Sequence, residues 1–333
     1  MTTILEHRYA HQIDPNGGSA AARLARMIEP GLRVLELGTG PGTVTRILHG
    51  KGCRVTGVEL DAEAIELCRP FCERIIQGDL TSNAWFAALQ GERFNAIVIA
   101  DVLEHLPRPQ ELLEQLPALL TPEGFVVISL PNASHLSVLG CLLGGVFPYQ
   151  TKGLLDHTHL RFFGRKDFEG LLNASGFMWQ RWESVELDPA QSELQPYWQN
   201  LSDADRAYLQ ERTVDGLVYQ HVTRAYPSSE AGHLAKLKAD LADGQAALRD
   251  MERSHAEQLA EQQAQHQRLL QDRQDCIAGL EEKTAALEAQ IRQLQQAVAS
   301  HQAQMAALLN SRSWRITRPL RRLSQWLTGS PGA

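Results

Sequence analysis

Short apolar runs in the first third of the chain end in residues that could hold a polar ligand. The first run ends at Glu36 and the turn Gly38-Thr39-Gly40, and the next three end near Glu59, Asp79 and Asp101. Glycine lets the backbone turn sharply and lets a ligand approach the main chain. A carboxylate can accept hydrogen bonds from ribose hydroxyls or from an adenine amino group. Any one of these residues could be a helix cap or a solvated loop carboxylate, but together they predict a nucleoside-binding site.

A dinucleotide site is the alternative for the glycine turn. Its fingerprint requires a third glycine where this chain has Thr43, and Pro41 fixes the conformation of the turn. The turn therefore suits a pyrophosphate less well than it suits a nucleoside ligand.

A second set of reactive side chains, Asp156, His157 and His159, follows the fifth apolar run. Either histidine could act as a general base that takes a proton from a substrate hydroxyl, and Asp156 could orient the imidazole. The alternative is a histidine that caps a turn or packs against Phe162 and Phe163. The spacing fits no common zinc pattern, so we predict no metal site.

Two further residues are weaker candidates. His105, in the segment LEHL, could shape the ligand pocket. Arg161 could meet an anionic substrate group such as a phosphate, or form a structural ion pair.

These side chains converge only if a sheet positions them. Apolar, β-branched runs predict strands at 33–37, 54–59, 74–77, 94–100 and 124–130, with helices at 43–50, 62–69 and 110–120 between them. Near-continuous apolar strands suit a sheet that is covered on both faces, and the alternation predicts a doubly wound α/β fold. Strands at 177–185 and 216–225 complete a mostly parallel, seven-stranded sheet. Ligands of such sheets lie at the carboxyl ends of the strands.

Residues 30–131 resemble the core of class I S-adenosylmethionine-dependent methyltransferases, with a Rossmann-like sheet. The matching segments are VLELGTGPG (34–42), VTGVELD (55–61), QGDL (77–80), IADVLEHL (99–106) and LLTPEGFVVISLPN (119–132). The resemblance implies S-adenosylmethionine as cofactor, with the turn Gly38-Thr39-Gly40 beneath its methionine part and Glu36 near its amino group. It also implies that Glu59 holds the ribose, that Asp79 and Leu80 flank the adenine, and that Asp101 and Val102 line the donor pocket.

The segment GLLDHTHLRFFGRKDFEGLLNASGF (153–177) resembles methyltransferases found with bacterial surface-polysaccharide (O-antigen-like) machinery. This second resemblance implies a sugar hydroxyl on a glycan or its precursor as acceptor. The alternatives are a small-molecule or protein methyltransferase, and a coiled-coil scaffold whose methyltransferase domain is degenerate.

The composition changes after residue 227. Residues 228–310 contain no Phe, Trp, Tyr or Pro and are rich in Ala, Gln, Leu, Glu and Arg, which is typical of a coiled coil. Apolar residues at three- and four-residue spacing predict a homo-oligomer through 234–308, and a single solvated helix is the alternative. The predicted domains are therefore a methyltransferase domain at 1–227, a coiled coil at 228–310 and a tail at 311–333.

The tail carries five arginines and no acidic residue, although the whole chain has a net charge of −7. Its leucines and tryptophans beside arginines predict peripheral membrane contact through 314–327, and a cap on the coiled coil or a protein-docking site are the alternatives. The tail also resembles an element of bacterial glycan-assembly proteins, which are expected partners. The net negative charge of the chain argues against nucleic acid as a partner.

The five cysteines are odd in number and lack C-x-x-C spacing, and the first residues lack a signal-peptide core. These features predict a cytoplasmic protein, with contact at the inner face of the cell membrane as the finer expectation.

Overall fold

The computed structural model describes residues 13–312, 315–317 and 319–320. The chain forms two compact units, Met1–Ala246 and Ala247–Ala333. Within the predicted membrane-contact segment 314–327, residues 314, 318 and 321–327 lie outside the described residues.

The first unit is built on a seven-stranded sheet in the order β3-β2-β1-β4-β5-β7-β6. The strands are β1 (Arg33–Leu37), β2 (Arg54–Glu59), β3 (Arg74–Gln77), β4 (Phe94–Ala100), β5 (Leu120–Pro131), β6 (Phe177–Glu186) and β7 (Val218–Pro227). The first five pair in parallel, whereas β7 is antiparallel to both β5 and β6. The predicted doubly wound, mostly parallel sheet is confirmed.

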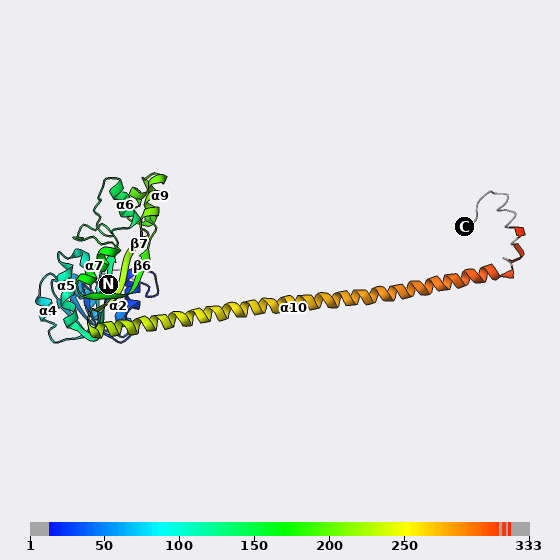
Figure 1. Cartoon of the computed structure of the whole chain (residues 1–333), viewed down its shortest axis with the longest axis horizontal. Helices are drawn as coiled ribbons and strands as arrows, with labels where there is room; N and C mark the ends of the chain where they lie inside the picture. The colour runs from blue at the N-terminus through cyan, green and yellow to red at the C-terminus, as the bar shows by residue number, and fades with distance from the viewer. Residues whose placement is uncertain (1–12, 313–314, 318, 321–333) are drawn as a thin grey trace, which may run out of the picture. The chain divides into compact units, whose positions relative to one another are not determined.

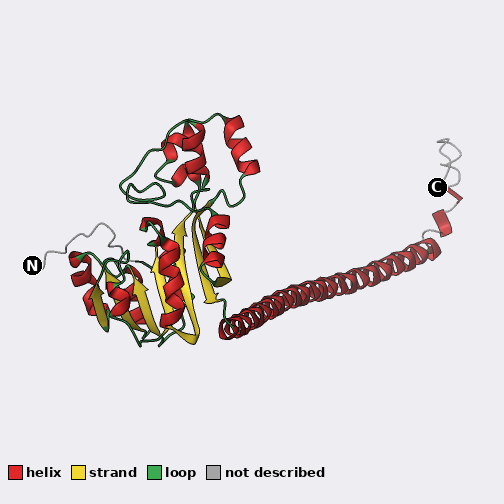
Figure 2. Ribbon diagram, turned by 60° about the vertical axis from the view of Figure 1, so that its left-hand side comes forward, coloured by secondary structure: helices red, strands yellow, loops and turns green. Residues whose placement is uncertain are grey.

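Helices cover both faces of this sheet (Figure 2). Helices α4 (Ala84–Ala87), α5 (Pro109–Gln115) and α7 (Arg165–Ala174) supply side chains to the core on one face, where Leu35 and Ile97 are buried. Helices α1 (Ala20–Arg26) and α2 (Thr43–Gly50) supply the core on the other face, where Val34 and Val98 are buried. Alternate strand residues point to opposite faces, so burial on both sides explains the near-continuous apolar strands.

Prolines shorten two of the predicted helices. The helix expected at 110–120 ends at Gln115 and continues as a 3-10 turn, Leu116–Leu119, around Pro117. Helix α3 (Ala62–Cys68) likewise passes into a 3-10 turn, Arg69–Phe71, that contains Pro70. Proline lacks the N–H that an α-helix interior requires.

A helical cap is inserted between β5 and β7. It contains α6 (Leu136–Leu143), α8 (Gln195–Gln199), α9 (Asp203–Arg212) and the 3-10 turn Pro189–Gln191, and Figure 1 shows α6 and α9 together, away from α4 and α5. Its small core includes Val138, Cys141 and Leu194. The buried Asn132, directly after β5, donates from its amide to the carbonyls of Asp215 and Val218. These bonds fix the cap at the carboxyl end of β5.

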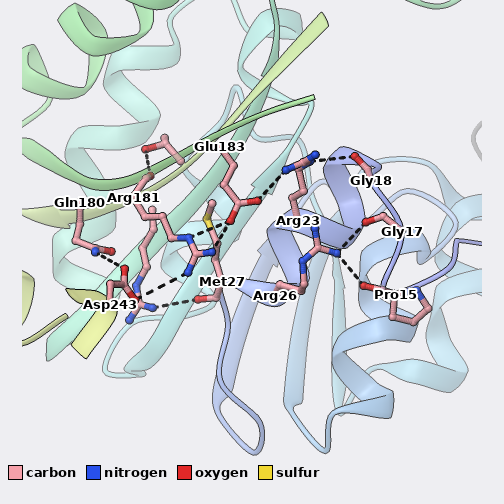
Figure 3. A network of polar contacts seen from close by, with 12 residues as sticks. Pro15, Gly17, Gly18, Arg23, Arg26, Met27, Gln180, Arg181, Glu183 and Asp243 are labelled. Atoms are coloured by element: carbon pink, nitrogen blue, oxygen red, sulfur yellow. Dashed lines mark hydrogen bonds and ion pairs between the residues drawn. The ribbon is translucent and has the colours of Figure 1, made fainter. Parts of the chain in front are cut away.

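Helix α10 (Glu230–Asn310) begins directly after β7, and its first turns pack within the sheet unit. Ala235 is buried there, and the Asp243 carboxylate accepts a hydrogen bond from the Gln180 amide at 2.9 Å. Arg181 pairs with Glu183, which also receives Arg23 of α1 (Figure 3). The polar contacts in Figure 3 thus join α1, β6 and the beginning of α10.

The second unit continues α10, whose leucines and isoleucines are exposed in the single chain, as at Leu280, Leu287 and Ile291. No helix among the described residues combines the length and the apolar character needed to cross a membrane.

Candidate active site

The turn after β1 is packed tightly at two of its glycines, both of which have a positive φ. Gly38 has φ +72°, and a Cβ there would lie 2.6 Å from Cγ2 of Val102. Gly42 has φ +86°, and its Cβ would lie 3.2 Å from Cys68. By contrast, a Cβ on Gly40 would meet no atom within 4 Å. The turn is therefore closed towards the protein and open to a ligand at Gly40.

Glu59, at the end of β2, ties the glycine turn to the next loop. Its carboxylate accepts hydrogen bonds from the backbone N–H groups of Gly40 at 2.7 Å, Leu60 at 2.8 Å and Asp61 at 3.0 Å. Each carboxylate oxygen has two lone pairs, so further capacity is left for ligand hydroxyls. This position fits a carboxylate that holds a ribose beside the turn.

Glu36 is a buried carboxyl beneath the same turn. Only 1% of its surface is exposed, and it accepts a hydrogen bond from Oγ1 of Thr45 at 2.7 Å. Burial raises its pKa well above the usual value, and the neighbouring Cys68 thiol adds to this rise. A cationic amino group nearby would offset the cost of a buried negative charge. The neighbouring Thr39 is also buried.

Asp101 follows β4 in a backbone conformation that is rare for residues other than glycine, with φ +53°. Its carboxylate accepts hydrogen bonds from Oγ of Ser129 at 3.0 Å and from Nε2 of Gln220 at 2.9 Å. Desolvation raises its pKa, although the residue is accessible at the surface. Accessibility together with desolvation is expected of a side chain that lines a concave site, and such strain is common at functional sites.

Asp79 and Leu80 follow β3. Asp79 is exposed, and its carboxylate accepts hydrogen bonds from the hydroxyl and the backbone N–H of Thr81, which lower its pKa. Leu80 is half-buried and packs against the core. The loop after β3 thus offers an apolar side chain, Leu80, and a hydrogen-bond acceptor, the Asp79 carboxylate.

The structure places the glycine turn, Glu36, Glu59 and Asp101 at the carboxyl ends of the adjacent strands β1, β2 and β4. The strand order reverses between β1 and β4, and ligands of open α/β sheets bind at such a point. The cofactor roles inferred for these side chains stay predictions, but their positions are compatible with one shared ligand.

The segment 153–163 is docked on the 3-10 turn η2 (Leu103–His105) that follows Asp101. The backbone N–H groups of Leu160 and Arg161 both donate to the carbonyl of Glu104. The Arg161 guanidinium donates to the carbonyl of Pro107 at 2.7 Å, so one of its functions is structural. The segment is thereby held against the turn that carries Glu104 and His105.

The three candidate catalytic residues differ in their surroundings. His159 is 9% exposed, and its ring lies 4.8 Å from the ring of His105, centroid to centroid. The side chain of His157 is exposed, and its Nδ1 lies 3.1 Å from the carbonyl oxygen of Gln150. Asp156 is buried and accepts hydrogen bonds from the backbone and hydroxyl of Thr158. The roles of the histidines as base and of Asp156 as orienter stay predictions.

Aromatic rings extend from His159 to the surface. Phe162 lies 6.1 Å from His159, Phe147 lies 5.4 Å from Phe162, and Tyr149 lies 5.2 Å from Phe147, all between ring centroids. Phe147, Tyr149 and Phe162 are exposed. These three residues, the aromatic wall, offer flat apolar surface to a bound molecule.

Sequence reasoning missed four residues of this region: Glu104, Ser129, Thr158 and Gln220. Glu104 did have a local signal, since it stands beside His105 in the segment after β4. Ser129 and Gln220 had none, because only the pairing of β4 with β5 and of β5 with β7 brings them to Asp101.

The sequence is similar to that of known methyltransferases. The sequence profile of a family described as a methyltransferase domain matches residues 6–180, just over half of the chain. A protein of Xanthomonas campestris pv. campestris named ubiquinone biosynthesis O-methyltransferase is 29% identical over 171 residues, covering 48% of this chain and 72% of that protein.

Two solved structures are similar to part of this chain. A SAM-dependent methyltransferase from Archaeoglobus fulgidus has a TM-score of 0.44 at 20% identity, covering 62% of this chain and 91% of that one. A 1,6-didemethyltoxoflavin-N1-methyltransferase from Burkholderia thailandensis, solved with S-adenosylhomocysteine, has a TM-score of 0.41 at 20% identity, covering 64% and 80%.

Proposed function

The chain belongs to the methyltransferase domain family, and we propose that this S-adenosylmethionine-dependent enzyme methylates a sugar hydroxyl on a surface glycan or its precursor. The observation that carries the cofactor assignment is the set of Gly38, Gly40, Glu59 and Asp101 at adjoining strand ends. A hydroxyl acceptor is favoured because the curated relatives are named O-methyltransferases.

Bound S-adenosylmethionine supplies a methyl group activated on a sulfonium sulfur. The acceptor hydroxyl would attack this methyl carbon with the sulfur as leaving group, and its proton would have to pass to a base held by the chain. Alignment contributes much of the rate enhancement, because holding two reactants in the correct orientation can lower the activation barrier by about 7–11 kcal/mol. The chain's task is therefore to hold the two reactants in line and to exclude water.

Several side chains would hold the cofactor. The Glu59 carboxylate would accept the ribose hydroxyls, and Asp79 with Leu80 would flank the adenine. Glu36 would lie near the methionine amino group beneath the turn, and Asp101 with Val102 would line the donor pocket.

The acceptor would lie between η2 and the aromatic wall. Exposed aromatic faces pack well against the C–H faces of a sugar ring, and His157 or His159 would take the hydroxyl proton. A phenolic hydroxyl is a second candidate, because the same wall can stack on an aromatic ring and the relatives are named for ubiquinone biosynthesis.

Helix α10 supports an assembly. Its exposed Leu287, Ile291, Leu294 and Val298 repeat at three- and four-residue spacing, which favours a homo-oligomeric coiled coil through 234–308. We further propose that the enzyme works in the cytoplasm with glycan-assembly proteins, and that its basic tail contacts the inner membrane face.

The test is a methyl-transfer assay of the full chain with labelled S-adenosylmethionine and three acceptor classes: glycans with sugar nucleotides, catechols, and proteins. We expect label on a sugar oxygen. Transfer only to the catechol would select the second candidate, and cofactor binding without transfer to any of them would leave the scaffold hypothesis.

A further inference from the structure

Three side chains with metal-binding atoms meet beside Asp101. Glu104 and His105 come from η2, and His159 comes from the docked segment after β5. One ligand atom from each lies within 4.8 Å of the other two. First-row cations bind nitrogen and oxygen at about 2.0–2.2 Å, so modest side-chain rotations would bring these atoms around one ion.

The hydrogen bonds of both imidazoles indicate the same tautomer. His105 Nδ1 lies 3.2 Å from the carbonyl oxygen of Thr158, and His159 Nδ1 lies 3.2 Å from that of Leu154. A carbonyl only accepts, so each Nδ1 carries the proton and each Nε2 keeps a lone pair. Metal-binding histidines usually donate their other ring N–H to a carbonyl or carboxylate in this way.

Glu104 gives an independent indication of a missing ligand. It is 1% exposed, and its Oε2 has no hydrogen-bond partner within the part of the chain that the structure describes. A buried carboxylate oxygen without a partner is costly. A cation bound at this oxygen would relieve that cost.

A short relay supports the geometry of His105. The Thr158 hydroxyl donates to the Asp156 carboxylate at 2.8 Å and lies 3.1 Å from His105 Nδ1. Asp156 thereby fixes Thr158, and Thr158 fixes the ring of His105. The buried acid of the docked segment acts here as a positioning residue.

We propose that Glu104, His105 and His159 bind one divalent first-row transition cation. Two imidazoles and one carboxylate are ligands of Zn²⁺, Mn²⁺ and Fe²⁺, and three protein ligands leave positions open for another oxygen. The spacing within 156–159 could not predict this site, because two of its ligands come from η2.

The role of the ion rests on the proposed function, whereas its binding does not. A cation next to Asp101 would bind the acceptor hydroxyl and ease the loss of its proton to solvent. His159 would then be a ligand, and the proton-accepting role predicted for it would pass to the metal site.

The experiment is calorimetric titration of the full chain, stripped with chelator, with Zn²⁺ and separately with Mn²⁺. We expect one ion per chain, and binding at least about tenfold weaker in Glu104→Gln and in His105→Asn. His49→Gln is the matched control, because this exposed histidine lies on α2 and packs against Phe71, outside the three-residue cluster. His105 is only half-buried, so its variant is informative even if Glu104→Gln fails to fold.

S-adenosylmethionine binding is measured on the same samples. Metal loss with intact cofactor binding in the two variants supports the site. The proposed site would be overturned if the wild-type protein bound neither ion. It would also be overturned if both variants bound the ions as tightly as the wild type does, because the binding would then be adventitious. If the wild-type protein binds the metal but does not bind S-adenosylmethionine, the result counts against the proposed function and not against the metal site.

Discussion

Replacing Glu59 by alanine tests the cofactor site most directly. The carboxylate accepts three backbone N–H bonds, from Gly40, Leu60 and Asp61. Hydrogen bonds to charged groups contribute about 1.5–3 kcal/mol each, and the two from Leu60 and Asp61 lie in exposed positions. Taking the lower end and discounting these two, we expect the free energy of unfolding to fall by about 2–4 kcal/mol.

Cofactor affinity should fall as well. Loss of one charged acceptor for the ribose costs about 1.4 kcal/mol or more, which is a factor of about ten or more in Kd. Calorimetry with S-adenosylmethionine measures this change, and urea unfolding measures the change in stability. Glu63→Ala, at an exposed position in the first turn of α3, is the control.

A loosened glycine turn could also weaken binding, so a second ligand is needed. An analogue that lacks the ribose 2′-hydroxyl should bind wild-type protein more weakly than S-adenosylmethionine does. The alanine variant should bind the two ligands almost equally, because the group that distinguishes them is gone. Equal discrimination by both proteins, with the variant folded, would refute the ribose role of Glu59.

Three further predictions address the turn, the sheet and the domain boundary. Gly38→Ala places a non-glycine residue in the left-handed region, which costs about 1–2 kcal/mol, and brings its Cβ to 2.6 Å from Cγ2 of Val102. The turn must therefore shift, and calorimetry should show at least about tenfold weaker cofactor binding. Burial lowers the pKa of His221 to about 4, so protonation favours the unfolded chain, and stability should fall as the pH drops from about 6.5 towards 4. Urea unfolding should show a loss of about 2 kcal/mol between pH 7 and pH 5, and less in His221→Gln. The chain cut to 1–246 should keep its stability in urea, whereas the chain cut to 1–227 should lose about 1–3 kcal/mol, because it lacks the buried Ala235 and the ion pairs of α10.

Each of these has a control or a contrary outcome. Gly50→Ala faces open space and should leave cofactor binding unchanged, so an equal effect at both glycines would remove the steric argument. An unaltered pH profile in His221→Gln would mean that other groups titrate in that range. Equal stability of the two shortened chains would place the end of the folded unit at 227 instead of 246.

The strands were predictable because each is a short apolar run bounded by glycine, proline or charge. Predicted bounds agree with the structure at β1, β2, β3 and β4. At β1, β2 and β4, burial on both faces leaves little freedom of composition. The cap helices α6, α8 and α9 were not predicted, since they are short and α9 buries no residue that would give it an apolar period.

The side chains predicted to bind the cofactor could be grouped from the sequence because parallel strands bring their carboxyl ends to one edge of the sheet. The surroundings of Asp101 were not, because Ser129 and Gln220 reach it through pairing across β5 and β7. The grouping of Glu104, His105 and His159 was hidden for a similar reason. It depends on the docking of segment 153–163 on η2, which is a tertiary contact between distant parts of the chain.

The reversed direction of β7 has a consequence for how copies of the enzyme could be joined. Because β7 runs opposite to β5, it ends at Pro227 beside Val126 and Phe177, and α10 starts from the amino edge of the parallel strands. Substrates would enter from the other edge. The start of α10 and the candidate active site therefore lie at opposite edges of the sheet, so the self-association proposed for α10 would begin at the edge away from the bound cofactor.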